Sequence, residues 1–365
     1  MFVAPAHVAA RLPAPVGSDG DDTGNPGLDL SNPRHARAIY LDLLGRTPDL
    51  DELQLAAGSS PSMMLRLLCG THGFWQHWYE EQLYYFLLLD NFRPHDPGPG
   101  QRLPDLLASG DLDVCSALRA TVGSSAFHRA NPGNDTFVSV VFEQLLGMTV
   151  QKQPALLEAG KRMYDGHGAS LWGQSGKSQS DVVRIAAAQP AFIERFVERE
   201  YSRFIGRAPG RKEAQRWSSE LAHDPGLYAD LVMGWLLSPA YGDRLQRLRR
   251  KSNRQFLQGL FVDLTGRPPD VETLERCRRA LSAVADAGPL RSVIARVLLR
   301  ADTLDLPSRD SLPVDDLVIH VFRRFLGRSP SPHEMDTFVT IFEQCECETD
   351  TLVRAVTTHW EYQYY

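Results

Sequence analysis

A helix-ending motif recurs along the chain and limits the folds it can adopt. Five segments start with an apolar helical pattern and stop at a glycine, which in four of them is followed by Arg-x-Pro. Successive glycines are 102, 59, 60 and 61 residues apart, and three nearly equal steps indicate tandem units. The corner residues are Gly45, Arg46, Pro48, Gly147, Gly206, Arg207, Pro209, Gly266, Arg267, Pro269, Gly327, Arg328 and Pro330, with Met148 replacing the second arginine.

Each corner contains the residues expected of a tight turn between two helices. The glycine supplies a left-handed residue at the helix end, and the proline disfavours a helical conformation for the residue before it. Asp49 and Glu52 then match a capping box at the start of the next helix. We expect the corner arginines to cap the last helical turn and to pair with nearby carboxylates, for which Asp42 and Asp263 occupy matching positions. An arginine ladder that binds a ligand is the alternative interpretation.

The repeat predicts both the fold class and the division of the chain. No stretch shows the alternating pattern of a strand, so we expect an all-α protein with about five tandem helical units of roughly 60 residues. A compact packing of the units is favoured over an open superhelix, because extra sequence interrupts the period after the first unit. The predicted segments are a disordered leader (1–30), unit 1 (31–95), an insertion or decayed unit (96–133), unit 2 (134–195), unit 3 (196–250), unit 4 (251–310) and unit 5 (311–365).

Composition excludes several classes of partner. The 365-residue chain has a net charge of −6, which gives no broad basic field, so we expect no nucleic-acid partner. The densest basic run, RLQRLRRKSNR at 244–254, is interpreted as a solvated helix end. Five cysteines without framework spacing favour a reducing, cytoplasmic location. No apolar run is long enough to span a bilayer, so we expect no membrane insertion.

Two bacterial families show similar motifs. The segment FVEREYSRFIGRAPGRKEAQRW, with its closing SPAYG, resembles a helical repeat domain of unknown function whose L-G-R-x-P-D corner is akin to that of phycobilisome linker domains. The first unit, with AIYLDLLGRTPDLDELQ and GFWQHWYEEQLYYF, also resembles the planctomycete cytochrome-associated domain. Together the resemblances cover most of residues 33–365 and imply a helical fold. They bring no catalytic site, and the haem motif C-x-x-C-H does not occur in this chain.

The sequence predicts no catalytic residue, no metal site and no cofactor. Three motifs begin like ligand sites but lack a required residue. They are GQSGKSQS at 173–180, which has Leu171 where a phosphate loop needs glycine; DGDDTG at 19–24, which has Leu30 where a calcium loop needs glutamate; and the possible soft-metal set Cys345, Cys347 and His359, which has no fourth ligand.

The most plausible functional surface is an aromatic stretch in the first unit. If exposed, these aromatics would form a protein-binding patch, and otherwise they are core residues at helical spacing. We therefore expect a noncatalytic scaffold or linker that binds other proteins. The alternative is an accessory or catalytic subunit of a bacterial redox or hydrolytic system, which requires His72, His77 and Asp90 to converge in one pocket. The candidate binding aromatics are Trp75, Trp78, Tyr79, Tyr84 and Tyr85.

Overall fold

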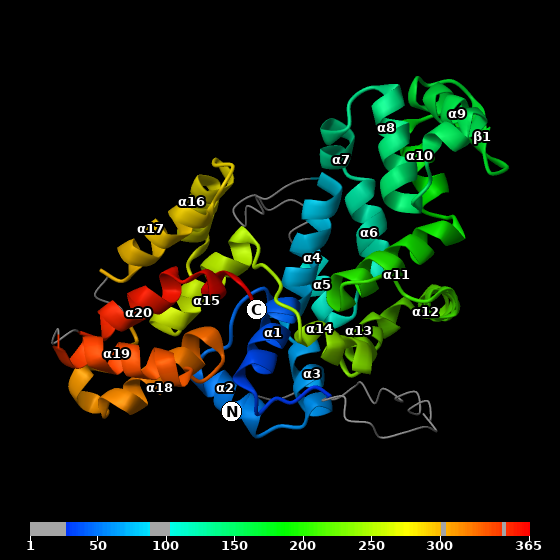
Figure 1. Cartoon of the computed structure of the whole chain (residues 1–365). Coiled ribbons are helices and arrows are strands. Elements are labelled where there is room, and N and C mark those ends of the chain that lie inside the picture. Colours follow the sequence, from blue (N-terminus) through cyan, green and yellow to red (C-terminus); the bar gives the residue numbers. More distant parts are fainter. Residues whose placement is uncertain (1–26, 88–102, 301–303, 345–347) are drawn as a thin grey trace.

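The computed structural model describes residues 27–87, 103–300, 304–344 and 348–365. These residues form twenty α-helices and one short two-stranded sheet, which confirms the predicted all-α class for the described part of the chain (Figure 1). The helices pack into two lobes, each around its own hydrophobic core.

The first lobe comprises residues 27–245. Leu28 and Leu30 pack against its core, so the folded region begins inside the predicted 1–30 leader. Its helices are α1 (Pro33–Leu44), α2 (Leu50–Ala57), α3 (Pro61–Cys69), α4 (His72–Leu87), α5 (Leu103–Ser109), α6 (Val114–Val122), α7 (Ser125–Ala130), α8 (Asn134–Val140), the π-helix η2 (Val141–Leu145), the 3-10 helix η3 (Val150–Lys152), α9 (Pro154–Tyr164), α10 (Gln179–Ala186), α11 (Pro190–Ile205), α12 (Arg211–His223), η4 (Pro225–Leu227), α13 (Tyr228–Leu236) and α14 (Pro239–Leu245).

A small hairpin lies between α9 and α10, where the sequence analysis expected no strands. Strands β1 (Ala169–Leu171) and β2 (Gln174–Gly176) pair antiparallel. Trp172 and Gly173 have φ values of 45° and 78°, the paired left-handed conformation of a two-residue hairpin turn. Strands of three residues are too short to show an alternating pattern, so periodicity did not reveal them.

The second lobe comprises described residues between 253 and 363, and its core includes the inward-facing residues of six helices and Tyr362. The last residue, Tyr365, belongs instead to the core of the first lobe, so the end of the chain connects the two. The elements of the second lobe are α15 (Asn253–Thr265), α16 (Val271–Ser282), α17 (Gly288–Leu298), η5 (Arg309–Ser311), α18 (Val314–Leu326), α19 (Pro332–Gln344), α20 (Thr349–Thr358) and η6 (Trp360–Gln363).

The five corner glycines share one backbone conformation. Gly45, Gly147, Gly206, Gly266 and Gly327 have φ values of 68°, 65°, 79°, 68° and 68°, in the left-handed region that favours glycine. Four of them end α1, α11, α15 and α18, and Gly147 follows η2. The direction of the chain therefore changes at these positions at little steric cost.

Two capping arrangements start the helices that follow the corners. Asp49 accepts a hydrogen bond from the Glu52 amide at 2.8 Å, and the Glu52 side chain accepts from the Asp49 amide at 2.9 Å. Ser331 and Glu334 make the same reciprocal pair at the start of α19. Both pairs satisfy backbone donors that a helix start leaves free.

The 96–133 segment, expected to be an insertion or a decayed unit, is helical where it is described. Helices α5, α6 and α7 pack against α4 and extend the first lobe. Phe127, at the start of α7, is fully buried, as is Phe74 near the start of α4.

Candidate functional site

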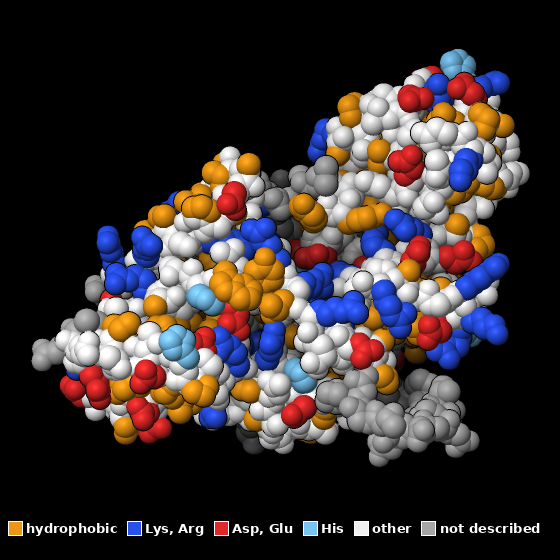
Figure 2. Space-filling model, in the orientation of Figure 1, with side chains coloured by type: hydrophobic (Ala, Val, Ile, Leu, Met, Phe, Trp, Pro, Cys, Tyr) orange, Lys and Arg blue, Asp and Glu red, His pale blue; other side chains and the backbone are white. Residues whose placement is uncertain are grey.

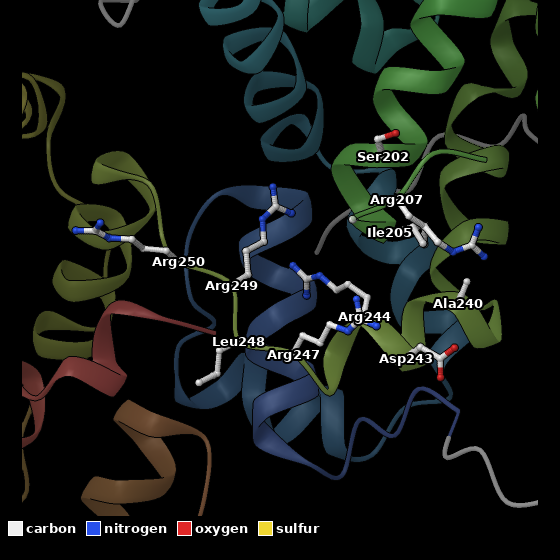
Figure 3. Close-up of a pocket in the computed structure, with 11 residues that line it drawn as sticks. Ser202, Ile205, Arg207, Ala240, Asp243, Arg244, Arg247, Leu248, Arg249 and Arg250 are labelled. Atoms are coloured by element: carbon white, nitrogen blue, oxygen red, sulfur yellow. The ribbon is translucent and has the colours of Figure 1, made fainter. Parts of the chain in front are cut away.

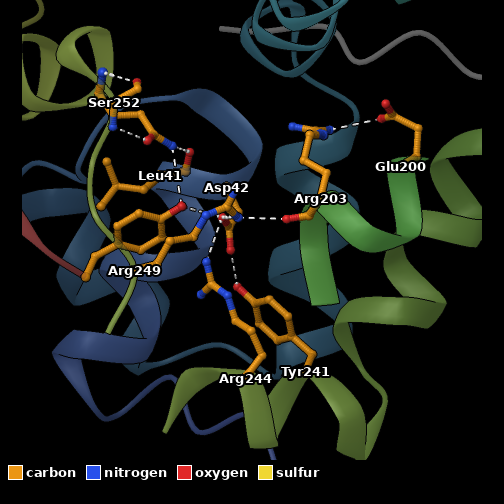
Figure 4. Close-up of polar contacts among 10 residues, drawn as sticks. Leu41, Asp42, Glu200, Arg203, Tyr241, Arg244, Arg249 and Ser252 are labelled. Atoms are coloured by element: carbon orange, nitrogen blue, oxygen red, sulfur yellow. Dashed lines mark hydrogen bonds and ion pairs between the residues drawn. The ribbon is translucent and has the colours of Figure 1, made fainter. Parts of the chain in front are cut away.

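Two buried aspartates join helices that are far apart in the sequence. Asp42 on α1 accepts hydrogen bonds from the hydroxyls of Tyr241 and Tyr365, both at 2.8 Å (Figure 4). Its Oδ1 also lies 3.1 Å from Arg244 Nη2 and 3.5 Å from Arg249 Nη1. One carboxylate thus holds α1, α14, the following linker and the end of the chain together.

Asp263 on α15 makes an equivalent junction between the lobes. Arg37 on α1 donates to both of its oxygens at 2.8 and 2.7 Å, and Thr47 Oγ1 donates at 3.1 Å. The hydroxyl of Tyr362 completes the set at 2.8 Å. Asp263 and Arg37 are both buried, so this ion pair is shielded from solvent.

These contacts correct the expected role of the two aspartates, which do not pair with the corner arginines. Arg46 instead forms a two-bond pair with Glu52, both at 2.6 Å. Arg328 pairs with Glu334 at 2.8 Å and with Glu361 at 2.8 and 2.6 Å. The glutamate of the next helix is closer to the corner than the preceding aspartate, whose side chain points into the protein.

The basic run after α14 is not a solvated helix end, as the sequence suggested. Its backbone pairs with the end of the chain, with Arg249 and Tyr365 exchanging amide-to-carbonyl bonds of 2.8 and 2.9 Å. The Lys251 amide donates to the Gln363 carbonyl at 2.8 Å. The backbone of the linker between the lobes is therefore held in place by the end of the chain.

A pocket of about 480 Å³ opens beside this linker, and we call it the arginine pocket (Figure 3). Five arginines and one aspartate, Asp243, contribute to its wall, on a chain whose net charge is −6. Figure 2 shows basic side chains gathered near the centre of the same face. The five arginines, from the end of α11, from α14 and from the linker, are Arg207, Arg244, Arg247, Arg249 and Arg250.

Arg244 lies at the buried side of the pocket and is 7% exposed. Burial lowers the pKa of Arg244, but the Asp42 carboxylate together with Tyr241 and Tyr365 more than offsets this, so the pKa lies above its ordinary value and the group stays charged. Its guanidinium carbon is 4.9 Å from the centre of the Tyr365 ring and 5.5 Å from that of Tyr241. These contacts fix its orientation.

A second unusual cation is Lys251, a residue of the linker whose side chain is buried. Its ammonium group donates to the Tyr362 carbonyl at 2.7 Å and lies 4.0 Å from the centre of that ring. Burial, together with the charges of Arg37 and Arg291, lowers its pKa to about 7, although Asp263 acts in the opposite direction. Lys251 therefore titrates near neutral pH at the point where the lobes meet.

The aromatics predicted to bind a partner are mainly core residues. Trp78 and Tyr79 are 1% and 3% exposed, so the prediction is wrong for these two. Trp75 is half-buried and packs edge-on against Trp78, with ring centres 6.2 Å apart. Tyr85 is half-buried and donates to the Gln144 carbonyl at 3.2 Å. Tyr84, at 53% exposed, projects into solvent, but helix α4 buries the other faces against the lobe.

The histidines of the catalytic alternative do not come together. His72 is exposed and pairs with Asp105 at 2.9 Å. His77 is buried against the corner Gly45, and burial, with nearby arginines, lowers its pKa well below the ordinary value. Asp90 lies outside the described residues, among which no cluster of three or more His, Cys, Asp or Glu side chains could hold a metal.

The remaining motifs do not form ligand sites where they are described. The phosphate-loop-like segment at 173–180 is the second half of the hairpin and the start of α10, where Ser178 caps the helix by accepting from the Asp181 amide. The calcium-like segment at 19–24 and the pair Cys345 and Cys347 lie outside the described residues. His359 accepts from the Glu361 amide at the start of η6.

Comparison with known proteins leaves the structure as the main guide to function. No protein-family model matches the chain, and a search of curated proteins gives no match. In the described ranges, no helix combines the length and apolar character needed to cross a bilayer. The arginine pocket is the strongest candidate site, and its one sequence signal was the basic run at 244–254.

Proposed function

We propose that this protein is a noncatalytic helical scaffold that binds other proteins, and that it does so by accepting an acidic segment in the arginine pocket. The observation that carries this proposal is the concentration of five arginines around one cavity of an acidic chain. Such a local field attracts anionic groups and repels cationic ones, so it selects partners by charge. The buried Asp42 orients Arg244 and contacts Arg249, two of the arginines in the pocket wall.

We further infer that the scaffold consists of five tandem units with glycine corners, four of them Gly-Arg-x-Pro, and that the 96–133 segment is an insertion or a decayed unit without a corner. The shared positive φ of the five glycines supports this scheme. So do the junction tyrosines, because Tyr241 follows Gly206, and Tyr362 follows Gly327, by the same 35 residues. Each tyrosine binds an aspartate placed three residues before another corner glycine.

The proposal places the protein in the cytoplasm with a protein partner and without a nucleic-acid partner. Cys69 and Cys115 are buried free thiols, as is usual in a reducing compartment. The arginine pocket gathers five basic side chains at one place, whereas duplex binding requires a basic stripe along a face.

The test is affinity purification of the tagged full-length chain from native lysate with quantitative mass spectrometry. The pocket variant carries Arg247→Glu and Arg250→Glu, and the matched control carries Arg129→Glu and Arg276→Glu on exposed parts of α7 and α16. We expect a stoichiometric protein that is retained by the wild type and the control but lost by the pocket variant. Equal retention by all three, absence of any specific partner, or substrate turnover by the purified chain would contradict the proposal.

A further inference from the structure

Within the described part of the chain, one nitrogen of Arg244, a residue that lines the arginine pocket, has no hydrogen-bond acceptor. Arg244 Nη2 lies 3.1 Å from Asp42, whereas its Nη1 is buried and has no partner among the described residues. A buried donor left without an acceptor destabilises the folded protein. An oxygen ligand that enters the pocket and accepts from Nη1 therefore removes a penalty that the protein already carries.

The pocket offers more donors around this nitrogen than its own residues use. Arg247 lines the pocket, and its side chain is exposed to solvent. Arg207 donates to the neighbouring Ala208 carbonyl at 3.3 Å, a weak contact that an anion can replace. In Figure 3 Arg207, which follows α11, and Arg247, from the linker, lie close to Arg244, whereas the Arg250 side chain extends away from them.

The number of donors distinguishes between the anionic groups that proteins present. A carboxylate has one charge and two oxygens, and a single arginine fork can engage both oxygens. A phosphate monoester carries about −1.5 to −2 charges at neutral pH and has three acceptor oxygens, so it uses several guanidinium groups at once. The combination of a buried, oriented Arg244 with the exposed Arg247 and the weakly bonded Arg207 fits the second group better.

We propose that the arginine pocket binds a phosphorylated side chain of the protein partner. This inference rests on the proposed scaffold function and specifies the ligand of the same site. The pocket volume of about 480 Å³ exceeds that of a phosphate group, so it also holds the side chain that bears it. Ile205, Ala240 and Leu248 provide an apolar wall for that aliphatic part.

The experiment measures binding of fluorescein-labelled peptides to the full-length protein by fluorescence anisotropy at physiological salt. Three peptides of otherwise identical Ala-Gly-Ser sequence carry phosphoserine, serine or glutamate at the centre. We expect the phosphoserine peptide to bind at least about tenfold more tightly than the other two, and inorganic phosphate to compete with it. Vesicles containing phosphatidic acid are assayed in parallel by co-sedimentation.

Variants connect the binding to the pocket. Arg244→Lys removes the unpaired Nη1, and we expect the preference for phosphoserine over glutamate to disappear. Because Arg244 also supports Asp42, the exposed Arg247→Ala is the second variant, with Arg276→Ala as its matched control. We expect Arg247→Ala to weaken phosphopeptide binding about five- to tenfold and Arg276→Ala to leave it unchanged.

Each contrary result has a distinct meaning. Equal affinity for the phosphoserine and glutamate peptides overturns the phosphate assignment, and so does binding that is confined to vesicles or unchanged by Arg247→Ala. The peptide assay and the affinity purification decide different proposals. If the peptide assay contradicts phosphate binding but the pocket variant loses its partner in the affinity purification, only the phosphate assignment fails and the scaffold function holds. If phosphopeptide binds as expected but no partner is captured, the scaffold function fails.

Discussion

Replacement of Asp42 by alanine tests whether the buried junction stabilises the fold. The substitution removes the acceptor for two tyrosine hydroxyls at 2.8 Å and the anionic partner of Arg244 at 3.1 Å. Breaking a buried ion pair by removing one partner costs about 3–5 kcal/mol, because the remaining charge is left uncompensated. Since proteins are typically stable by 5–15 kcal/mol, we expect Asp42→Ala to lose a large fraction of the total.

The assay is urea unfolding followed by tryptophan fluorescence and by circular dichroism. The exposed Asp336→Ala on α19 is the matched control and should change the free energy of unfolding by less than about 0.5 kcal/mol. The double variant Asp42→Ala with Arg244→Met removes both charges and should recover about 1–2 kcal/mol relative to Asp42→Ala. A loss below about 1 kcal/mol for Asp42→Ala, or no recovery in the double variant, would refute the reasoning.

Two further predictions concern the lobe boundary and the corners. The Lys251 pKa falls from 10.5 when unfolded to about 7 when folded, so the unfolded chain binds the extra proton and stability rises with pH between these values. Between pH 7 and pH 9 the free energy of unfolding should increase by about 2 kcal/mol more in the wild type than in Lys251→Met. Parallel urea titrations of the two proteins measure this difference. Identical pH profiles would contradict the assigned titration of Lys251. Gly45→Ala places a Cβ 2.6 Å from His77 Nδ1 at a φ of 68° and should cost about 2–4 kcal/mol. Gly206→Ala has a φ of 79° but meets no atom within 4 Å, so thermal unfolding should show a loss of about 1–2 kcal/mol; equal losses would contradict the role of the contact.

Features that depend on neighbouring residues were predictable from the sequence. The helical class follows from apolar periodicity, and the positive φ of glycines such as Gly45 follows from local chain sterics. The capping box of Asp49 and Glu52 joins residues three apart, so its two partners are visible in one short motif. The hairpin at 169–176 was missed because three-residue strands carry too little pattern.

The candidate site was predicted poorly for a different reason. The aromatic stretch around Trp78 was a reasonable surface by composition, but burial depends on which other helices cover it. Asp42 and Asp263 occupy matching positions before their glycines, which correctly singled them out. Their partners could not be found by spacing, because Arg244 is 202 residues from Asp42 and Arg37 is 226 residues from Asp263.

The sequence by itself determined where helices begin and end and where the chain turns, because these depend on backbone conformation and contacts within a few residues. The tertiary structure alone decided that the chain forms two lobes, that the basic linker pairs with the segment around Tyr365, and that five arginines surround one pocket. Those outcomes follow from packing and charge pairing between distant segments, whose energies depend on the whole fold.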